Sequence, residues 1–144
     1  MTKYKFISWN LNGIRSSYKK GLIDIMKDID ADVYCFQETK AKKEQVDDDL
    51  LNIESYSGYW NPAEKDGYSG VISYSKEEPI SVSQGLGDEK FEKEGRVLTL
   101  EYDDFFLLNV YFPNAGRGLK RLDFKLDFNK QFLKYIEGLR EENP

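Results

Sequence analysis

The sequence predicts a mixed α/β fold, and three observations indicate this class. A strand-length run, a helix-length amphipathic stretch and a second strand-length run follow one another within the first 37 residues. Two of the predicted strands are apolar without alternation, which is typical of strands that are covered on both faces. Apolar residues then recur at helical spacing over residues 119–140 and predict a long helix. The 144 residues, 40% of them hydrophobic, are enough for one core and too few for two.

The amino-terminal part of the chain predicts a βαβ unit. A strand over residues 4–9 stops at the turn-forming sequence Asn-Leu-Asn-Gly. A helix over residues 17–28 follows, because a serine can cap it and its apolar residues form one stripe. The apolar run 33–36 is the second strand. Strands joined in this way are parallel, with a right-handed crossover between them.

The rest of the chain predicts a charged helix, several short strands and the long helix. The helix over residues 40–51 carries three consecutive aspartates, which we interpret as a solvated face rather than a metal site. Further strands are expected at 56–60, 70–74, 80–82, 97–102 and 105–112, the last two as a hairpin. Residues 105–112 are apolar on both faces, which predicts a central strand.

The composition excludes several kinds of chemistry and partner. Histidine is absent, which excludes serine–histidine and cysteine–histidine catalysis within this chain, and the single cysteine, Cys35, excludes an internal disulfide. The net charge is −5, so any nucleic-acid contact must be local or metal-assisted. No signal peptide is visible, and no apolar run approaches the ~20 residues that cross a bilayer. We therefore expect a soluble, cytoplasmic protein that does not contact a membrane.

Two polar residues stand where a βαβ unit places a site. Asn10 ends the first predicted strand and Glu38 follows the second, so both lie at the carboxyl edge of the sheet. A carboxylate beside a carboxamide offers oxygen ligands to a hard cation such as Mg²⁺, which completes its shell with water and phosphate. The alternative is a plain turn at Asn10 and a solvated acid at Glu38.

Six motifs follow one another along nearly the whole chain. They are Ser-Trp-Asn-Leu-Asn-Gly-Ile-Arg at 8–15, Gln-Glu-Thr-Lys at 37–40, Gly-Tyr-Ser-Gly-Val at 67–71, Glu-Gly-Arg at 94–96, Asn-Val-Tyr-Phe-Pro-Asn at 109–114 and Arg-Leu-Asp-Phe-Lys at 121–125. In this order they resemble the exonuclease III family of apurinic/apyrimidinic (AP) endonucleases, within the endonuclease/exonuclease/phosphatase superfamily. The tyrosine strand with its Pro-Asn end and the Gly-Tyr-Ser-Gly-Val motif favour this branch over sphingomyelinases and inositol phosphatases.

The resemblance implies a Mg²⁺-dependent phosphodiesterase of base-excision repair that cuts double-stranded DNA 5′ to abasic sites and also has 3′–5′ exonuclease action. Glu38 would be the principal ligand of Mg²⁺, with Mn²⁺ as a substitute, and Asn10 would orient metal-bound water or the phosphate. Tyr111 would be the catalytic hydrogen-bond donor to the scissile phosphate. The residues that would contact DNA or phosphate, or brace the pocket, are Asn12, Lys40, Tyr68, Arg96 and Asn114.

The resemblance covers only the amino-terminal half of the family's fold, a four-layer α/β sandwich of two similar halves. We therefore expect residues 1–144 to be half of that sandwich, a mixed β-sheet with helices on one face, truncated before the Gly-Asp-x-Asn strand. The absent segments would hold the aspartate base and the histidine, so we expect this chain alone to be inactive. The strand 105–112 would leave an exposed apolar sheet face, which packs on the missing carboxyl-terminal half or on a second copy.

Two alternative functions stay open. The first is another phosphoesterase of the same superfamily that acts on a small molecule or a lipid, and incision of an abasic duplex against phosphate release would separate the two. The second is a non-catalytic half-domain that acts through assembly, which size measurements alongside activity would test. Residue by residue, Trp9 and Tyr68 also fit packing aromatics, and Tyr111 fits a core position when its motif is set aside.

Overall fold

The computed structural model describes residues 3–143 and confirms the mixed α/β class. The strands are β1 (Phe6–Asn10), β2 (Val33–Gln37), β3 (Ser57–Asn61), β4 (Val71–Ser75), β5 (Ser81–Gln84), β6 (Val97–Glu101) and β7 (Phe106–Val110). The helices are α1 (Ile14–Lys19), α2 (Leu22–Ile29), α3 (Asp48–Leu51), α4 (Glu89–Glu92) and α5 (Leu122–Glu142), with 3₁₀ turns at Lys43–Gln45 and Arg117–Leu119. Within the described range, no helix is both long and apolar enough to cross a membrane.

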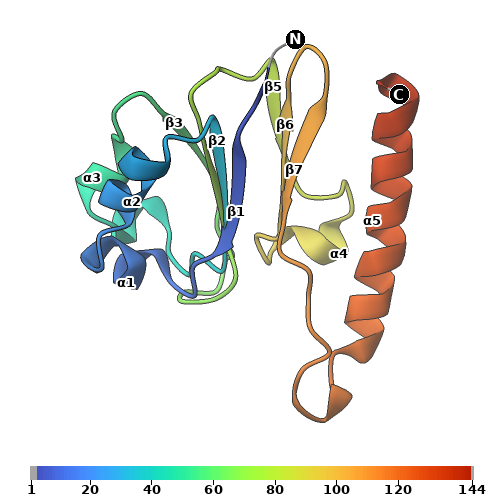
Figure 1. Cartoon of the computed structure of the whole chain (residues 1–144). Helices are drawn as coiled ribbons and strands as arrows, with labels where there is room; N and C mark the ends of the chain where they lie inside the picture. The colour runs from blue at the N-terminus through green and yellow to red at the C-terminus, as the bar shows by residue number, and fades with distance from the viewer. Residues whose placement is uncertain (1–2, 144) are drawn as a thin grey trace.

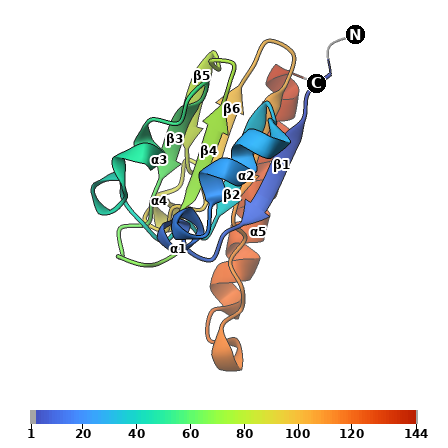
Figure 2. The same cartoon turned by 60° about the vertical axis from the view of Figure 1, so that its left-hand side comes forward.

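The strands form two sheets that face each other. The first has the order β1-β2-β4-β3, with β1 and β2 parallel and the other pairs antiparallel, and the second is the antiparallel sheet β5-β6-β7. Helices α1, α2 and α3 cover the outer face of the first sheet, and α5 lies on the outer side of the second (Figures 1 and 2). The chain therefore contains helix, sheet, sheet and helix layers rather than one sheet with helices on one face.

The expected central strand at 105–112 is wrong in one respect, because β7 lies at the edge of the three-stranded sheet. The strand is apolar on both faces because one face packs against the other sheet and the other face packs against α5. Phe105 and Leu107 pack with the core between the two sheets, while Val110 packs with the core under α5. A strand between another sheet and a helix is apolar on both faces wherever it stands in its own sheet. The expected fully bare sheet face is not observed, because residues 105–108 and 110 are partly buried against the other sheet or α5. Part of the strand still lines an open cavity.

The predicted helix over 17–28 is interrupted. Lys20 and Gly21 separate α1 from α2, and Gly21 has a φ of +95°, which glycine adopts without a steric penalty. After this turn, α2 directs Leu22 and Met26 onto the outer face of the first sheet, where both are buried with Tyr34. Burying each such side chain contributes about 1.5–3 kcal/mol, which fixes the helix on the sheet.

Among the four edge strands of the two described sheets, β1 and β7 are the pair whose open edges border a cavity. Within the described residues, β1 pairs only with β2 and β7 only with β6, and these two edges lie beside each other (Figure 1). A cavity of about 460 Å³ lies between them, lined by residues of β1, β2 and β7 and by Phe132 of α5. Phe6 and Phe112, which line this cavity, are exposed. Unpaired edges beside exposed aromatics are surfaces on which proteins associate.

Candidate active site

Glu38 is directed into the site by an unusual backbone conformation. It follows the last residue of β2 with a φ of +50°, in the left-handed region. The side chain of Gln37 points to the second sheet, where it contacts Asn109, so the next side chain of a regular strand would point away from that sheet. The left-handed turn changes this direction, and the Glu38 carboxylate reaches Tyr111. Non-glycine residues rarely adopt this conformation, and such strain gathers at functional sites.

Three loops interlock around this turn at one edge of the first sheet. The Gly13 amide donates to the Glu38 carbonyl oxygen at 2.7 Å, and the Lys40 amide donates to the Ser69 carbonyl oxygen at 2.8 Å. Asn12, Lys40 and Ser69 also have positive φ values, between 48° and 56°. The backbone hydrogen bonds hold these strained residues in place, so the side chains they carry are positioned before any ligand binds.

The Glu38 carboxylate is the centre of a polar cluster. Its Oε1 accepts hydrogen bonds from the Tyr111 hydroxyl at 2.7 Å and from Asn10 Nδ2 at 3.2 Å. Its Oε2 lies 3.5 Å from Lys40 Nζ, which donates to Asn12 Oδ1 at 2.6 Å. The backbone amide of Asn12 in turn donates to Asn10 Oδ1 at 3.1 Å. The cluster therefore brings together one carboxylate, two carboxamides, an ammonium group and a phenol.

The protonation states in this cluster are set by its geometry. Partial burial would raise the pKa of Glu38, but the hydrogen bonds from Tyr111 and Asn10 and the charge of Lys40 outweigh it and lower the pKa. Burial and the hydrogen bond to the Glu38 carboxylate raise the pKa of Tyr111 to about 12. At neutral pH, Glu38 is an anion and Tyr111 is a hydrogen-bond donor.

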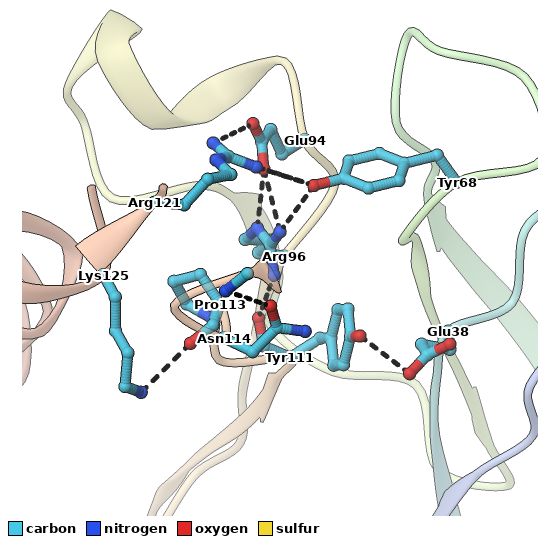
Figure 3. A network of polar contacts seen from close by, with 10 residues as sticks. Glu38, Tyr68, Glu94, Arg96, Tyr111, Pro113, Asn114, Arg121 and Lys125 are labelled. Carbon is cyan, nitrogen blue, oxygen red and sulfur yellow. Dashed lines mark hydrogen bonds and ion pairs between the residues drawn. The ribbon is translucent and has the colours of Figure 1, made fainter. Parts of the chain in front are cut away.

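A second cluster braces the tyrosine from the other side (Figure 3). The buried Arg96 donates from Nε to Glu94 Oε1 at 2.9 Å, from Nη2 to the Tyr68 hydroxyl at 2.9 Å and from Nη1 to the Tyr111 carbonyl oxygen at 3.2 Å. Arg121 donates to both Glu94 oxygens, at 3.1 and 2.7 Å, and to the Tyr68 hydroxyl at 2.8 Å. The guanidinium carbon of Arg96 lies 5.0 Å from the centre of the Tyr111 ring.

Seven of the predicted site residues lie in the two clusters, and one, Asn114, lies apart from both. Asn10, Asn12, Glu38, Lys40 and Tyr111 form the first cluster, and Tyr68 and Arg96 belong to the second. Asn114 is exposed, and its Oδ1 accepts from the Gly116 amide at 2.8 Å, a contact local to the loop that follows β7.

Sequence reasoning missed Glu94 and Arg121 as members of the site. Glu94 stands two residues before Arg96, and Arg121 begins the last of the six motifs, but their pairing spans 27 residues of sequence. Both residues are charged and lie inside a motif, and this was the signal from which they could have been predicted. The pair borders an open cavity of about 610 Å³, which is also lined by Tyr68 and two lysines, Lys65 and Lys93.

The oxygen atoms of the first cluster fit a hard divalent cation. Within the described residues, no group of three or more acidic, cysteine or histidine side chains is arranged so that it could hold a metal ion by itself. Mg²⁺ needs no such group, because one or two carboxylates suffice when water and substrate phosphate complete the shell. Glu38 Oε2 accepts no hydrogen bond from Tyr111 or Asn10, which both use Oε1. Glu38 Oε2 and Asn10 Oδ1 are therefore the ligand atoms that would hold the ion.

Comparison with known proteins decides the family. A family model described as "Endonuclease/Exonuclease/phosphatase family" matches residues 7–144. The chain belongs to this family. An exodeoxyribonuclease of Bacillus subtilis is 45% identical over 141 residues, which are 97% of this chain and 55% of that protein. The DNA repair nuclease APEX1 of Danio rerio is 42% identical over 142 residues, 97% of this chain and 46% of that protein.

Solved structures of the family share the fold. The catalytic domain of APE2 from Xenopus laevis has a TM-score of 0.83 and 27% identity, over 96% of this chain and 55% of that one. The AP endonuclease LMAP from Leishmania major has a TM-score of 0.76 and 31% identity, over 92% of this chain and 47% of that one. The chain thus spans about half the length of these members of the family, and the resemblance drawn from the six motifs is confirmed.

Proposed function

We propose that this chain is the amino-terminal half of a Mg²⁺-dependent DNA-repair phosphodiesterase that cuts DNA 5′ to abasic sites and trims 3′ ends. The observation that carries the proposal is the hydrogen bond between Tyr111 and Glu38, which joins a phenol donor on one sheet to a carboxylate on the other. A phosphate group that approaches a cation on Glu38 would meet the Tyr111 hydroxyl within the same cluster.

Each residue of the cluster has a role in this proposal. Glu38 holds the cation, for which Mn²⁺ is a substitute, and Asn10 orients a bound water or a phosphate oxygen. The cation supplies a Lewis acid that neutralises phosphate charge. Tyr111 turns its hydroxyl from Glu38 to a phosphate oxygen and stabilises the charge that grows in the transition state. Its high pKa keeps the proton in place for this hydrogen bond.

The surrounding residues form the DNA-contacting part of the proposal. Lys40 and Asn12 lie at the carboxylate, and Tyr68 borders the open cavity with Arg121 above it. Arg96 fixes both Tyr68 and the backbone of Tyr111, so it braces the site rather than facing solvent. This local positive charge serves an overall acidic protein, in which bulk attraction to DNA is weak.

The same proposal includes a missing half. Metal-assisted hydrolysis also needs a positioned nucleophile, and among the described residues the cluster holds no carboxylate other than Glu38 to act as a base. The relatives are about twice as long as this chain. We propose that the rest of the protein supplies this base and pairs with the open edges of β1 and β7, with a second copy of the chain as the alternative partner.

The test is fragment complementation on a duplex with one abasic site. The 144-residue chain is assayed with Mg²⁺ alone, and then with the separately produced carboxyl-terminal half of the 45% identical Bacillus subtilis relative. We expect incision only with both fragments, and its loss in Glu38→Ala or Tyr111→Phe. Glu44→Ala, at an exposed glutamate outside both clusters, is the matched control.

Two outcomes would contradict the proposal. Mg²⁺-dependent nicking by the homogeneous 144-residue chain would show that the half-domain is already complete. Hydrolysis of small phosphoesters without incision of the abasic duplex would instead favour a phosphoesterase of another branch of the family.

A further inference from the structure

Two buried side-chain amides, those of Gln37 and Asn109, connect the two sheets next to the proposed site. Asn109 of β7 is buried, and its Nδ2 donates to the carbonyl oxygens of Phe36 and Ile72, at 3.2 and 2.9 Å, and to Ser73 Oγ at 3.1 Å. Its Oδ1 accepts from Gln37 Nε2 at 2.9 Å. One side chain of the second sheet is thus bonded to both β2 and β4 of the first.

Other polar contacts also join the two sheets: Asn61 donates to the Val97 carbonyl oxygen (2.7 Å), Gln84 donates to the Trp60 carbonyl oxygen (2.8 Å), and Ser75 contacts Tyr102 (2.8 Å). None of these three involves β2, whereas the Asn109 contact joins β7 to both β2 and β4. The neighbouring contacts are apolar, among them those of Cys35, Leu100 and Leu107, and apolar packing is not directional. The Asn109 amide needs its partners at fixed points, because a buried polar group without a partner is costly. A shift of β7 by one residue would turn Asn109 out of the interface and bring an aliphatic neighbour into it.

The two amides are also adjacent in sequence to the residues of the site. Asn109 precedes Tyr111 by two residues, so both side chains leave β7 on the same face. The Tyr111 amide donates to the Arg96 carbonyl oxygen at 2.8 Å, which continues the strand pairing up to the tyrosine. Gln37 immediately precedes Glu38. The register fixed by the amide pair is therefore carried within one or two residues to the carboxylate and the phenol.

We propose that Asn109 is a positioning residue that sets the place of the Tyr111 hydroxyl against the Glu38 carboxylate by locking β7 onto β2 and β4. The effect of this positioning on phosphate binding rests on the proposed function, whereas the positioning of Tyr111 by Asn109 does not. Glu38 and Tyr111 lie on different sheets, and Asn109 makes the directional contact from β7 to β2 and β4 beside them.

The test compares Asn109→Leu with Thr99→Val in the full 144-residue chain. Leucine is close to asparagine in shape and removes every hydrogen bond of the amide. Thr99→Val removes a partly buried hydrogen bond to the Tyr135 hydroxyl of α5 (2.7 Å), on the other face of the second sheet. The measurements are the nuclear Overhauser effect between the Tyr111 ring and the Glu38 side chain, and the chemical shift of Tyr111 ¹³Cζ at one neutral pH.

We expect both variants to lose stability, but only Asn109→Leu to lose the Tyr111–Glu38 Overhauser effect and to shift Tyr111 ¹³Cζ. An unchanged effect in folded Asn109→Leu overturns the proposal. If that variant does not fold, Gln37→Met and Ser73→Ala decide, since each removes one partner of Asn109. Shifts at Tyr111 in both support the proposal, and unmoved signals overturn it. Neither metal nor DNA is used, so this result is independent of the complementation assay.

Discussion

Replacing Glu94 by glutamine tests the brace behind Tyr111. The Glu94 carboxylate is hydrogen-bonded by Arg96 and by both Nη atoms of Arg121. The Glu94 side chain is 20% exposed, while the Arg96 side chain is only 4% exposed. Glu94→Gln keeps the shape but removes the charge, and it leaves the buried Arg96 guanidinium with Tyr68 and the Tyr111 carbonyl oxygen as partners.

The magnitude follows from this burial. Removing one partner of a fully buried ion pair costs about 3–5 kcal/mol, whereas an exposed pair contributes about 0.2–1 kcal/mol. Because Glu94 is a fifth exposed, Arg121 is 36% exposed and glutamine retains one acceptor, we expect a loss of about 2–3 kcal/mol. For a domain of this length that corresponds to a fall in Tm of roughly 5–10 °C.

The pH dependence gives the same prediction a second readout. Burial would raise the pKa of Glu94, but the hydrogen bonds and charges of Arg121 and Arg96 outweigh it and lower the pKa. A lowered pKa in the folded state means that the stabilisation is complete above the unfolded pKa of about 4.3 and is lost as the pH falls through the folded value. The difference between wild type and Glu94→Gln should therefore be largest at neutral pH and shrink in acid.

The assay is urea unfolding followed by circular dichroism at pH 7 and at pH 3. Asp127→Asn is the control, because Asp127 and Lys90 form an exposed ion pair for which we expect no measurable change. A Glu94→Gln variant as stable as Asp127→Asn at pH 7, or one whose deficit grows in acid, would refute the reasoning. It would mean that the cluster is an ordinary surface network.

Three further predictions concern the site and the open edges. In the complemented enzyme, Tyr111→Phe should lower kcat by about 10²–10³-fold with KM nearly unchanged, since one transition-state donor is lost; a matching rise in KM alone would argue for ground-state binding. In the 144-residue chain, Glu38→Gln should abolish most of the Mn²⁺ binding seen by electron paramagnetic resonance, while Glu44→Gln should not. The mass measured by light scattering should rise with concentration, and Phe6→Lys on the exposed edge strand β1 should suppress this rise; a wild-type chain that stays monomeric throughout would contradict the open-edge interpretation.

The sequence predicted the part of the site that depends on local rules. Asn10 and Glu38 meet because they end parallel neighbouring strands, and this could be inferred from a βαβ pattern alone. The position of Tyr111 beside them came only from the family resemblance. No periodicity says which sheet a strand joins, and a strand packed between a sheet and a helix has the same apolar pattern as a central strand.

The left-handed conformation of Glu38 and the pairing of Glu94 with Arg121 could not be predicted from the sequence. The left-handed conformation at Glu38 has no marker in the sequence, because glycine and asparagine are the residues that usually signal it. The pairing of Glu94 with Arg121 depends on how the loop after β7 returns to the loop before β6. The break at Gly21, by contrast, had a signal in the sequence, since a glycine inside a predicted helix often ends or interrupts it.

The neighbouring open edges of β1 and β7 have a consequence for synthesis on the ribosome. The described residues form four layers, and we expect this part of the chain to fold before the proposed second half emerges. At about 5–20 residues per second, the proposed second half, if of similar length, takes on the order of ten seconds to follow. During that interval the open edges of β1 and β7 and a cavity of about 460 Å³ are exposed to the cell. We expect this nascent chain to depend on a chaperone that binds apolar segments, or on slow initiation that keeps nascent copies apart.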